Sequence, residues 1–495
     1  MMDAYRELEG KFAQRAALGD ALGLLSWDQN VLMPDGAADR RADTMAALEG
    51  LSHRLLIAPE IAELLEKATT DGSLWQTSNL AWMKRQYARA MAVPSDLVEA
   101  LSSARVRSEA AWRVARETSD FESFLPRFQT VLDLTREVGT VVGEVLGLSP
   151  YDALLDGFDP GMRQAIIDPI FKDLSGKLPA LLEEVLTYQR KQPRSLRPQG
   201  PFPVEAQKKL GRAMMKRMGF DFSRGRLDVS LHPFCGGATN DVRITTRYDE
   251  ADFLPALFGV IHETGHALYD QGLPSVWRGQ PVGDALGMTL HESQSLIMEM
   301  QFCRSEAFTA FMGPRLAECF GVDESLPEWS AESLRQAVQD VKPGLIRVDA
   351  DELTYPAHIL VRYRIETDLI AGRLALRDLP EAFNAGIREL LGIEVPDNRQ
   401  GCLQDIHWPE GLFGYFPCYT LGALTAAQFA SAIEQTADVN GALREGDFAP
   451  IRQWLSDHVW SRASSVPPMQ LIREATGHDL SADAFLARAR RRYLG

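Results

Sequence analysis

One short segment restricts how this chain can fold, because two of its histidines can bind the same metal ion only if the segment is helical. This segment is the apolar run 258–269, which contains the pattern H-E-x-x-H at His262, Glu263 and His266. On a helix, residues i and i+4 lie on one face, about 40° apart, so both imidazoles can reach one ion. Glu263 projects about 100° away from His262, close enough to act on a water at the ion without being a ligand. The spacing predicts a helix that carries a metal site.

The neighbouring residues fit such a helix. Ile261 and Leu268 are apolar and are expected to pack the back of the helix, while Gly265 is expected to keep the site face open. Zinc needs neutral nitrogen ligands and, for catalysis, one coordination position left to water. The alternative is an ordinary amphipathic helix with two histidines in a polar seam, and this context disfavours it. We interpret the segment as the site of a metallopeptidase.

A third ligand must come from elsewhere in the chain. The metzincin pattern would continue with glycine at 269 and histidine at 272, where this chain has Tyr269 and Gly272. The next strong candidate is the pair His291 and Glu292, which opens an apolar helical run. Adjacent helical residues do not share a face, so only one of the two should bind the metal. Two histidines and one glutamate form a common hydrolytic zinc set. We therefore prefer Glu292 and expect His291 to support the ligands or the core.

Composition limits the partners and the location. A net charge of −16 argues against a nucleic acid partner, because phosphate contacts require an excess of lysine and arginine. No stretch has the roughly 18 consecutive apolar residues of a membrane-spanning helix, and the start does not resemble a signal peptide, so no membrane partner is expected. The five cysteines are scattered and odd in number, as expected for free thiols in a reducing compartment. We expect a cytoplasmic protein.

Apolar residues at a spacing of three to four predict that most of the chain is helical. The predicted helices cover residues 5–25, 37–56, 76–92, 94–117, 121–146, 160–191, 292–312, 333–341 and 352–371. A proline-rich stretch near 192–203 could mark a domain boundary. We interpret it as a surface connection within one large helical body, so that residues 1–495 form a single domain. A basic cluster at the end is expected to be a solvated helix face, and it comprises Arg488, Arg490, Arg491 and Arg492.

One region just before the metal helix has the pattern of β-strands. Apolar and polar residues alternate over 227–232 and again over 242–245, and the glycine-containing stretch 235–240 between them resembles a turn. We predict an antiparallel ribbon whose edge can bind an extended peptide through backbone hydrogen bonds. The alternative is a hairpin that only supports the helix. His232, at the end of this ribbon, is a candidate to hydrogen-bond substrate or the oxyanion, or else is structural.

Further short motifs follow one another along the chain. They are Trp27–Gln29 with Met33-Pro34, Pro150–Asp156, His232–Phe234, Asp241–Thr245, His291–Gln294, Ile346–Asp351 and Gly401–Trp408. In this order, and together with the H-E-x-x-H pattern, they resemble the motifs of the thermostable carboxypeptidase Taq family of metallocarboxypeptidases. The resemblance covers nearly the whole chain.

The resemblance implies a mostly α fold, with a large helical body, a long active-site groove and a small antiparallel β-sheet beside the metal site. It implies one Zn²⁺ ion per chain, with Co²⁺ or Mn²⁺ as alternatives, peptide substrates and a homodimer. It also points to Arg347 as the residue that binds the terminal carboxylate of a peptide, because arginine forms bidentate, charge-assisted bonds with carboxylates. The implied activity is the release of C-terminal residues with broad specificity.

We expect Glu263 to take a proton from water and pass it to the leaving amine. A tyrosine or histidine near the metal would stabilise the oxyanion. Four residues in polar and aromatic stretches are candidates for this role: Tyr363, His407, Tyr415 and Tyr419. Asp405 could orient a histidine or cap a helix.

Two other functions remain open. The first is an endo-acting helical zinc oligopeptidase, which would also cleave peptides whose C-terminus is amidated. The second is a non-catalytic binding protein that the metal only stabilises. A closed structural site would need a fourth protein ligand, and His291 is the nearby candidate.

Overall fold

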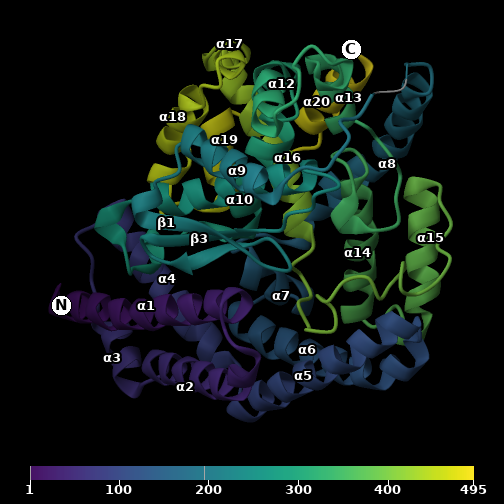
Figure 1. Cartoon of the computed structure of the whole chain (residues 1–495). Helices are drawn as coiled ribbons and strands as arrows, with labels where there is room; N and C mark the ends of the chain where they lie inside the picture. Colours follow the sequence, from purple (N-terminus) through teal and green to yellow (C-terminus); the bar gives the residue numbers. More distant parts are fainter. Residues whose placement is uncertain (1, 194–195) are drawn as a thin grey trace.

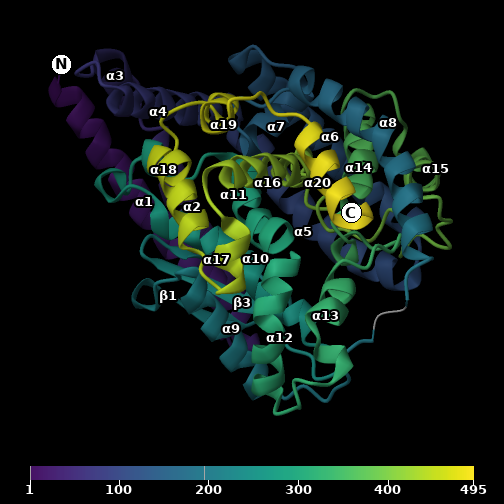
Figure 2. The same cartoon turned by 90° about the horizontal axis from the view of Figure 1, so that it is seen from above.

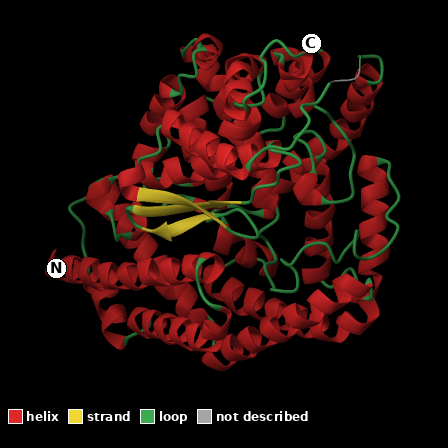
Figure 3. Cartoon of the chain, viewed as in Figure 1, coloured by secondary structure: helices red, strands yellow, loops and turns green. Residues whose placement is uncertain are grey.

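The computed structural model describes residues 2–193 and 196–495, and it is mostly helical with one small sheet (Figure 3). Residues 194 and 195 of the predicted connection near 192–203 lie outside the described residues. The predicted mostly α fold with a small sheet is confirmed. None of the described helices combines the length and the apolar character that crossing a membrane requires.

Helices make up the whole amino-terminal part of the chain. They are α1 (Met2–Val31), α2 (Ala38–Leu56), α3 (Pro59–Lys67), α4 (Leu74–Ala92), α5 (Ser95–Thr118), α6 (Phe121–Leu146), α7 (Pro150–Phe158) and α8 (Gln164–Gln189). Six of them correspond to predicted helices, whereas α3 and α7 were not predicted. The start of α7 follows ordinary capping rules, because Pro150 occupies its first turn and the Ser149 side chain accepts a hydrogen bond from the Asp152 amide.

The sheet has three strands, β1 (Gly225–Val229), β2 (Cys235–Ala238) and β3 (Asp241–Thr246), in the order β1-β3-β2. Only β2 is antiparallel to β3, and β1 runs parallel to it. The predicted antiparallel pairing of the first and last segments is therefore wrong. The stretch 235–240, predicted as a turn, contains β2 itself, because Gly236 and Gly237 resemble turn residues but pair with β3.

This sheet lies between two helices (Figure 1). On one side, Val242 and Ile244 of β3 pack against Val260 and Ala267 of α10 (Leu254–Gly272), the helix that carries the H-E-x-x-H pattern. On the other side, α1 runs along β2, and Asp20 accepts hydrogen bonds at 2.9 Å from both the amide and the hydroxyl of Thr239. The predicted position of the sheet beside the metal helix is confirmed.

The remaining helices build the rest of the body. They are α9 (Val204–Met218), α11 (Gly287–Leu296), α12 (Glu306–Phe320), α13 (Ala331–Val338), α14 (Tyr355–Ile370), α15 (Leu379–Leu391), α16 (Pro417–Thr436), α17 (Val439–Arg444), α18 (Ala449–His458), α19 (Pro468–Thr476) and α20 (Asp483–Leu494). The prediction of one helix over 292–312 is wrong. Here α11 continues into a π-helical turn, Ile297–Phe302, and Ser305 then caps the separate helix α12.

The helices around the metal motif belong to one hydrophobic core. Its buried side chains extend along the chain from Trp112 to Tyr493 and include residues of α10, α11, α14 and α16. Figure 2 shows α11 and α16 in the middle of the molecule, surrounded by other helices. A second, smaller core joins α1, α3 and α4. The H-E-x-x-H pattern thus lies on a helix of the larger core. That residues 1–495 form one single domain stays a prediction.

Candidate active site

The structure brings together the three residues predicted to bind metal. His262 and His266 lie on α10, and Glu292 lies on α11. The Nε2 atom of His262 is 4.0 Å from one carboxylate oxygen of Glu292, and Nε2 of His266 is 3.7 Å from the other. Three potential ligand atoms, one from each of these residues, all lie within 4.8 Å of one another. Glu263 is 8% exposed, so the carboxylate beside these ligands is largely shielded from water.

Close packing of three helices places Glu292 at this position. A Cβ atom on Gly265 of α10 would lie 2.3 Å from the backbone oxygen of Gln294 in α11. The expectation that Gly265 keeps the site face open is therefore wrong, because this glycine allows α10 and α11 to touch. A Cβ atom on Gly422 of α16 would lie 2.8 Å from the Glu292 side chain. Glycines thus let backbones approach closely on two sides of Glu292.

His262 has a carboxylate partner that was not predicted. Its Nδ1 atom lies 2.8 Å from Glu299 of the π-helical turn, whose other oxygen accepts a hydrogen bond of 2.6 Å from Arg304. Burial would raise the pKa of Glu299, but Arg304 and His262 outweigh it and hold this pKa at about 2. An ionised Glu299 accepts the Nδ1 proton, which leaves Nε2 of His262 free to face Glu292.

His291 supports His266 in a similar way. The Nδ1 atoms of the two imidazoles are 2.7 Å apart, and Nε2 of His291 is 3.3 Å from Asp270. One choice of tautomers makes both contacts hydrogen bonds. In it, Nδ1 of His266 donates to Nδ1 of His291, and Nε2 of His291 donates to Asp270. The prediction that His291 supports the ligands agrees with this geometry. Asp270 was missed, although it follows His266 by four residues and so shares its helical face.

The donor set fits a divalent cation. Two imidazoles with free Nε2 atoms and one carboxylate are ligands that Zn²⁺ takes in hydrolytic enzymes. Burial lowers the pKa of His262, yet the nearby carboxylates of Glu299, Glu292 and Glu263 raise it to about 10. The surplus of negative charge that favours a proton here also favours a metal ion in its place.

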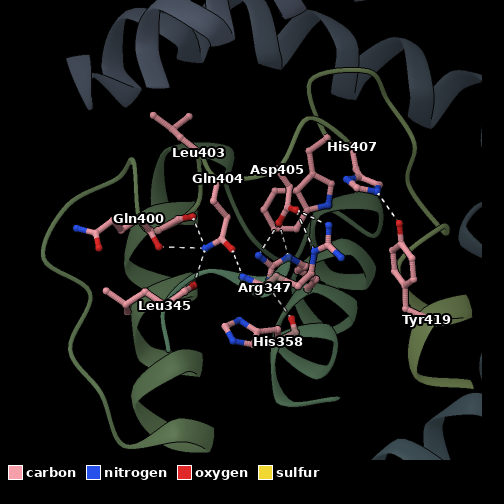
Figure 4. A network of polar contacts seen from close by, with 12 residues as sticks. Leu345, Arg347, His358, Gln400, Leu403, Gln404, Asp405, His407 and Tyr419 are labelled. Carbon is pink, nitrogen blue, oxygen red and sulfur yellow. Dashed lines mark hydrogen bonds and ion pairs between the residues drawn. The ribbon is translucent and has the colours of Figure 1, made fainter. Parts of the chain in front are cut away.

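A second cluster surrounds Arg347, which lies in a short 3₁₀ turn and is 6% exposed. Its guanidinium contacts Asp405 at 2.9 and 3.0 Å, and its amide donates to the Gln404 side chain at 2.9 Å (Figure 4). Asp405 also accepts bonds of 2.8 and 2.5 Å from Arg362 of α14. Burial raises the pKa of Asp405, but the two guanidinium groups outweigh it and hold this pKa well below its usual range. Asp405 neither orients a histidine nor caps a helix here, because it pairs with two arginines.

The charge of this cluster acts on Glu292. The two guanidinium groups of Arg347 and Arg362 share the carboxylate of Asp405, so these three side chains together carry one net positive charge. Burial raises the pKa of Glu292, and Arg347 is among the positive groups that oppose this rise. The guanidinium carbon of Arg347 also lies 5.0 Å from the centre of the Tyr419 ring. A negatively charged group near Glu292 would therefore meet a cation that is already held in place.

Of the other predicted residues, three lie together and two lie elsewhere. His407, Tyr415 and Tyr419 lie together, since Nε2 of His407 is 3.3 Å from the Tyr419 hydroxyl and the two tyrosine rings are 5.3 Å apart. The hydroxyl of Tyr363 instead donates to Asp168 of α8 at 2.5 Å. His232 lies in the exposed connection between β1 and β2, where its backbone oxygen accepts a bond from Ser230.

Known proteins match this chain over nearly its full length. The family model of the carboxypeptidase Taq (M32) metallopeptidases matches residues 7–493. The chain belongs to this family. It is 39% identical over 504 residues to thermostable carboxypeptidase 1 of Thermus thermophilus, covering 98% of this chain and 97% of the relative. It is 33% identical over 467 residues to carboxypeptidase 1 of Bacillus subtilis, covering 93% of this chain and 92% of that one.

Solved structures agree with this assignment. Metallocarboxypeptidase 1 of Trypanosoma cruzi superposes with a TM-score of 0.98 at 40% identity, and the match covers 100% of both chains. The M32 carboxypeptidase of Deinococcus radiodurans superposes with a TM-score of 0.93 at 33% identity, covering 99% of both chains. The predicted resemblance is confirmed, and the protein is a metallocarboxypeptidase.

Proposed function

We propose that this metallocarboxypeptidase holds one Zn²⁺ ion per chain on His262, His266 and Glu292 and removes C-terminal residues from peptides of varied sequence. When bound, the ion supplies Lewis acidity toward water and the scissile carbonyl. Co²⁺ and Mn²⁺ are alternative occupants, because the same nitrogen and oxygen donors accept them. The proposal rests on the convergence of three ligand atoms from α10 and α11.

We assign the proton transfers to Glu263. It lies between the two histidines in the sequence, it is largely buried, and it is not part of the three-residue ligand group. Burial raises the pKa of its carboxyl to about 7, which His262 partly opposes. A base with a pKa near neutrality can take a proton from water and return it to the leaving amine.

We assign recognition of the free C-terminus to Arg347. This residue is one of the three side chains that together carry one net positive charge, and Asp405 and the aromatic ring of Tyr419 fix its side chain. A substrate carboxylate would supply the missing negative charge. Because every peptide ends in the same carboxylate, an anchor of this kind supports broad specificity and the release of one residue at a time.

The oxyanion is assigned to the group formed by His407, Tyr415 and Tyr419. Burial lowers the pKa of His407 to about 4, so its imidazole is neutral at neutral pH. Its Nδ1 atom is buried without a hydrogen-bond partner among the described residues. A preorganised neutral donor can stabilise developing negative charge without a cost of reorganisation. His232 remains a further candidate for contact with substrate.

The test combines metal analysis with two blocked dipeptides that differ only at the C-terminus, one a free acid and one an amide. We expect about one divalent ion per chain, and we expect cleavage of the free acid but not of the amide. Cleavage of both peptides would favour an endo-acting oligopeptidase and remove Arg347 from its assigned role. Bound metal without cleavage would favour a non-catalytic metal-stabilised protein.

We also propose a cytoplasmic homodimer. The five cysteines are free thiols, as expected in a reducing compartment. Light scattering of the purified chain tests the dimer, with a mass of about twice 55.0 kDa expected and a mass of 55.0 kDa contradicting it.

A further inference from the structure

The basic cluster in the last helix does not form a solvated face. Arg490 and Arg491 are exposed, as expected, but Arg488 is 7% exposed and the Arg492 side chain 9%. The expectation is wrong for these two residues, because α20 packs against the body and turns one of its faces inward. Two buried guanidinium groups therefore need partners inside the protein.

Arg492 finds its partners at the end of the π-helical turn. It donates to the backbone oxygen of Met300 at 2.5 Å and to that of Gln301 at 2.7 Å, and it pairs with Glu352. The last carbonyls of a helical segment lack N–H donors from a following turn. Arg492 thus caps the π-helical turn from another helix.

The side chain of Gln301 strengthens this connection. It donates to Glu352 at 2.7 Å and accepts from Arg488 at 2.6 Å, while the Tyr493 hydroxyl donates to the second oxygen of Glu352 at 3.1 Å. Gln301 is 2% exposed and Glu352 is 6% exposed. Three residues of α20 are therefore tied to one turn through buried polar bonds, which are costly to break.

The same turn carries Glu299, the partner of His262. A π-helical turn contains one extra residue relative to an α-helix and depends on its surroundings to persist. If Ile297–Phe302 relaxed to α-helical geometry, the residues within it would change their direction around the helix axis. Glu299 would then lose its position opposite Nδ1 of His262.

We infer that α20 sets the orientation of a metal ligand. Arg492 fixes the π-helical turn, the turn fixes Glu299, and Glu299 holds His262 with Nε2 facing Glu292. Arg492 is thus a positioning residue for metal binding, although it belongs to the last turns of the chain. This inference rests on the proposed metal site at His262, His266 and Glu292.

The test measures the affinity of the full-length chain for Zn²⁺ and Co²⁺ alone, by competition with a chelator, and the visible spectrum of the Co²⁺ form. Arg492→Met keeps much of the side-chain length but removes every hydrogen bond. Its dissociation constant for Zn²⁺ is expected to rise about 10- to 100-fold, as for other residues that support metal ligands, with an altered Co²⁺ spectrum. Arg490→Met is the matched control, since Arg490 is on the same helix and, among the residues that the structure describes, its one ion pair is the exposed pair with Glu184. It is expected to bind both metals like the wild type.

Two further variants separate positioning from a general loss of structure. Arg492→Lys retains the charge opposite Glu352, so it can be measured even if Arg492→Met does not fold. Its dissociation constant for Zn²⁺ should lie between those of Arg492→Met and the wild type. Glu299→Gln should weaken Zn²⁺ binding by a similar factor. Combining it with Arg492→Met should add little, because both changes act through the same contact.

Unchanged metal affinity in both Arg492 variants would overturn the inference, even if they unfold at lower temperature. Fully additive effects of Glu299→Gln and Arg492→Met would also overturn it. A wild-type chain that binds neither metal would overturn the proposed metal site and this inference with it. Metal binding by the wild type with unaffected Arg492 variants would overturn this inference alone.

Discussion

Each histidine in the site uses its two nitrogen atoms for different tasks. Nε2 of His262 and of His266 faces Glu292, while each Nδ1 is held by a neighbour, Glu299 for the first and His291 for the second. These neighbours fix the tautomer and the direction of each ring, so the ligand atoms are preorganised for a metal. The two histidines of the proposed site follow from the sequence motif, but the residues that hold their Nδ1 atoms lie on other elements.

Replacement of Glu263 by glutamine tests its role as the base. Glutamine has nearly the same shape but cannot accept the proton from water. We expect a loss of kcat of about 10²- to 10⁴-fold, with metal content unchanged because His262, His266 and Glu292 are intact. Turnover and metal content are measured on the same sample. Substantial activity in this variant would refute the assigned mechanism.

Replacement of Arg347 by methionine tests the carboxylate anchor. Arg362 still pairs with Asp405, so the buried carboxylate is not left without a partner. We expect kcat/KM for a free-acid peptide to fall about 100-fold or more, since a charge-assisted bond contributes roughly 1.5–3 kcal/mol and Arg347 can make two. The control is Arg364→Met, which removes an exposed arginine from the same region. Equal kcat/KM in the wild type and Arg347→Met would exclude the anchor.

Asp159 makes stability depend on pH. It is fully buried, and burial raises the pKa of its carboxyl from 3.8 to about 7. The folded protein therefore keeps this carboxyl protonated up to a higher pH than the unfolded chain does. The resulting contribution to the free energy of unfolding is fully present below pH 3.8 and is lost as the pH rises through about 7. Asp159→Asn should be more stable than the wild type at pH 8 by a few kcal/mol, given about 1.4 kcal/mol per pKa unit.

Urea unfolding of both proteins between pH 5 and pH 8 measures this difference. The wild type should lose stability relative to Asp159→Asn as the pH rises, whereas Asp43→Asn, an exposed site on α2, should follow the wild type. Parallel curves for the wild type and Asp159→Asn would show that the carboxyl is not protonated in the folded state.

At the residue scale, the sequence pointed to His262 and His266 as a pair on one helical face because the i and i+4 spacing is local, and the structure brings them together with Glu292. It could not predict the fate of Asp405, whose two arginine partners are 58 and 43 residues away. It missed Glu299 for a related reason. That residue reaches His262 only because the segment after α11 forms a π-helical turn, which the spacing of apolar residues does not reveal.

At the scale of elements, the contact between α10 and α11 decides whether the site exists. Ala in place of Gly265 would bring a Cβ atom to 2.3 Å from a backbone oxygen and 2.6 Å from the Ser295 Cα. Backbone atoms cannot rotate away, so α11 must shift. We expect a loss of about 1–3 kcal/mol in the free energy of unfolding and weaker metal binding, since Glu292 moves with α11.

Gly176→Ala is a matched control for this change. Gly176 lies inside α8, and a Cβ atom there meets nothing within 4 Å. Alanine should stabilise the protein slightly, because it favours helix by up to about 1 kcal/mol relative to glycine. Thermal unfolding and chelator competition measure both variants. If Gly265→Ala has the same melting temperature and metal affinity as Gly176→Ala, then α10 and α11 can move apart without loss of stability or of metal binding.

Helices were easier to predict than the sheet, for a physical reason. Each amphipathic helix carries its own period in the sequence, so α4, α5 and α6 were found nearly at their bounds. The direction of β1 relative to β3 depends on how the connection 230–234 crosses back, and alternation of residues contains no information about it. Gly236 and Gly237 resemble turn residues, so the sequence pattern did not show that they belong to strand β2.

At the scale of the whole molecule, the metal should act as part of the folded structure. The three proposed ligands lie on two helices of the largest core, so unfolding would separate them and release a bound ion. A ligand that binds only the folded state adds about 4 kcal/mol of stability at a concentration 1,000 times its dissociation constant. We expect removal of metal by a chelator to lower the melting temperature, and return of Zn²⁺ to restore it.

Replacement of Glu292 by glutamine separates this effect from general destabilisation. The metal-free wild type crowds Glu263, Glu292 and Glu299 around His262, as the raised pKa of that histidine indicates. Removing one of these charges should leave the metal-free protein at least as stable, while the increment caused by Zn²⁺ should largely disappear. The control is Glu389→Gln, an exposed carboxylate on α15. An intact Zn²⁺ increment in Glu292→Gln would mean that the ion is held without Glu292, and the role of third ligand would pass to the neighbouring His291.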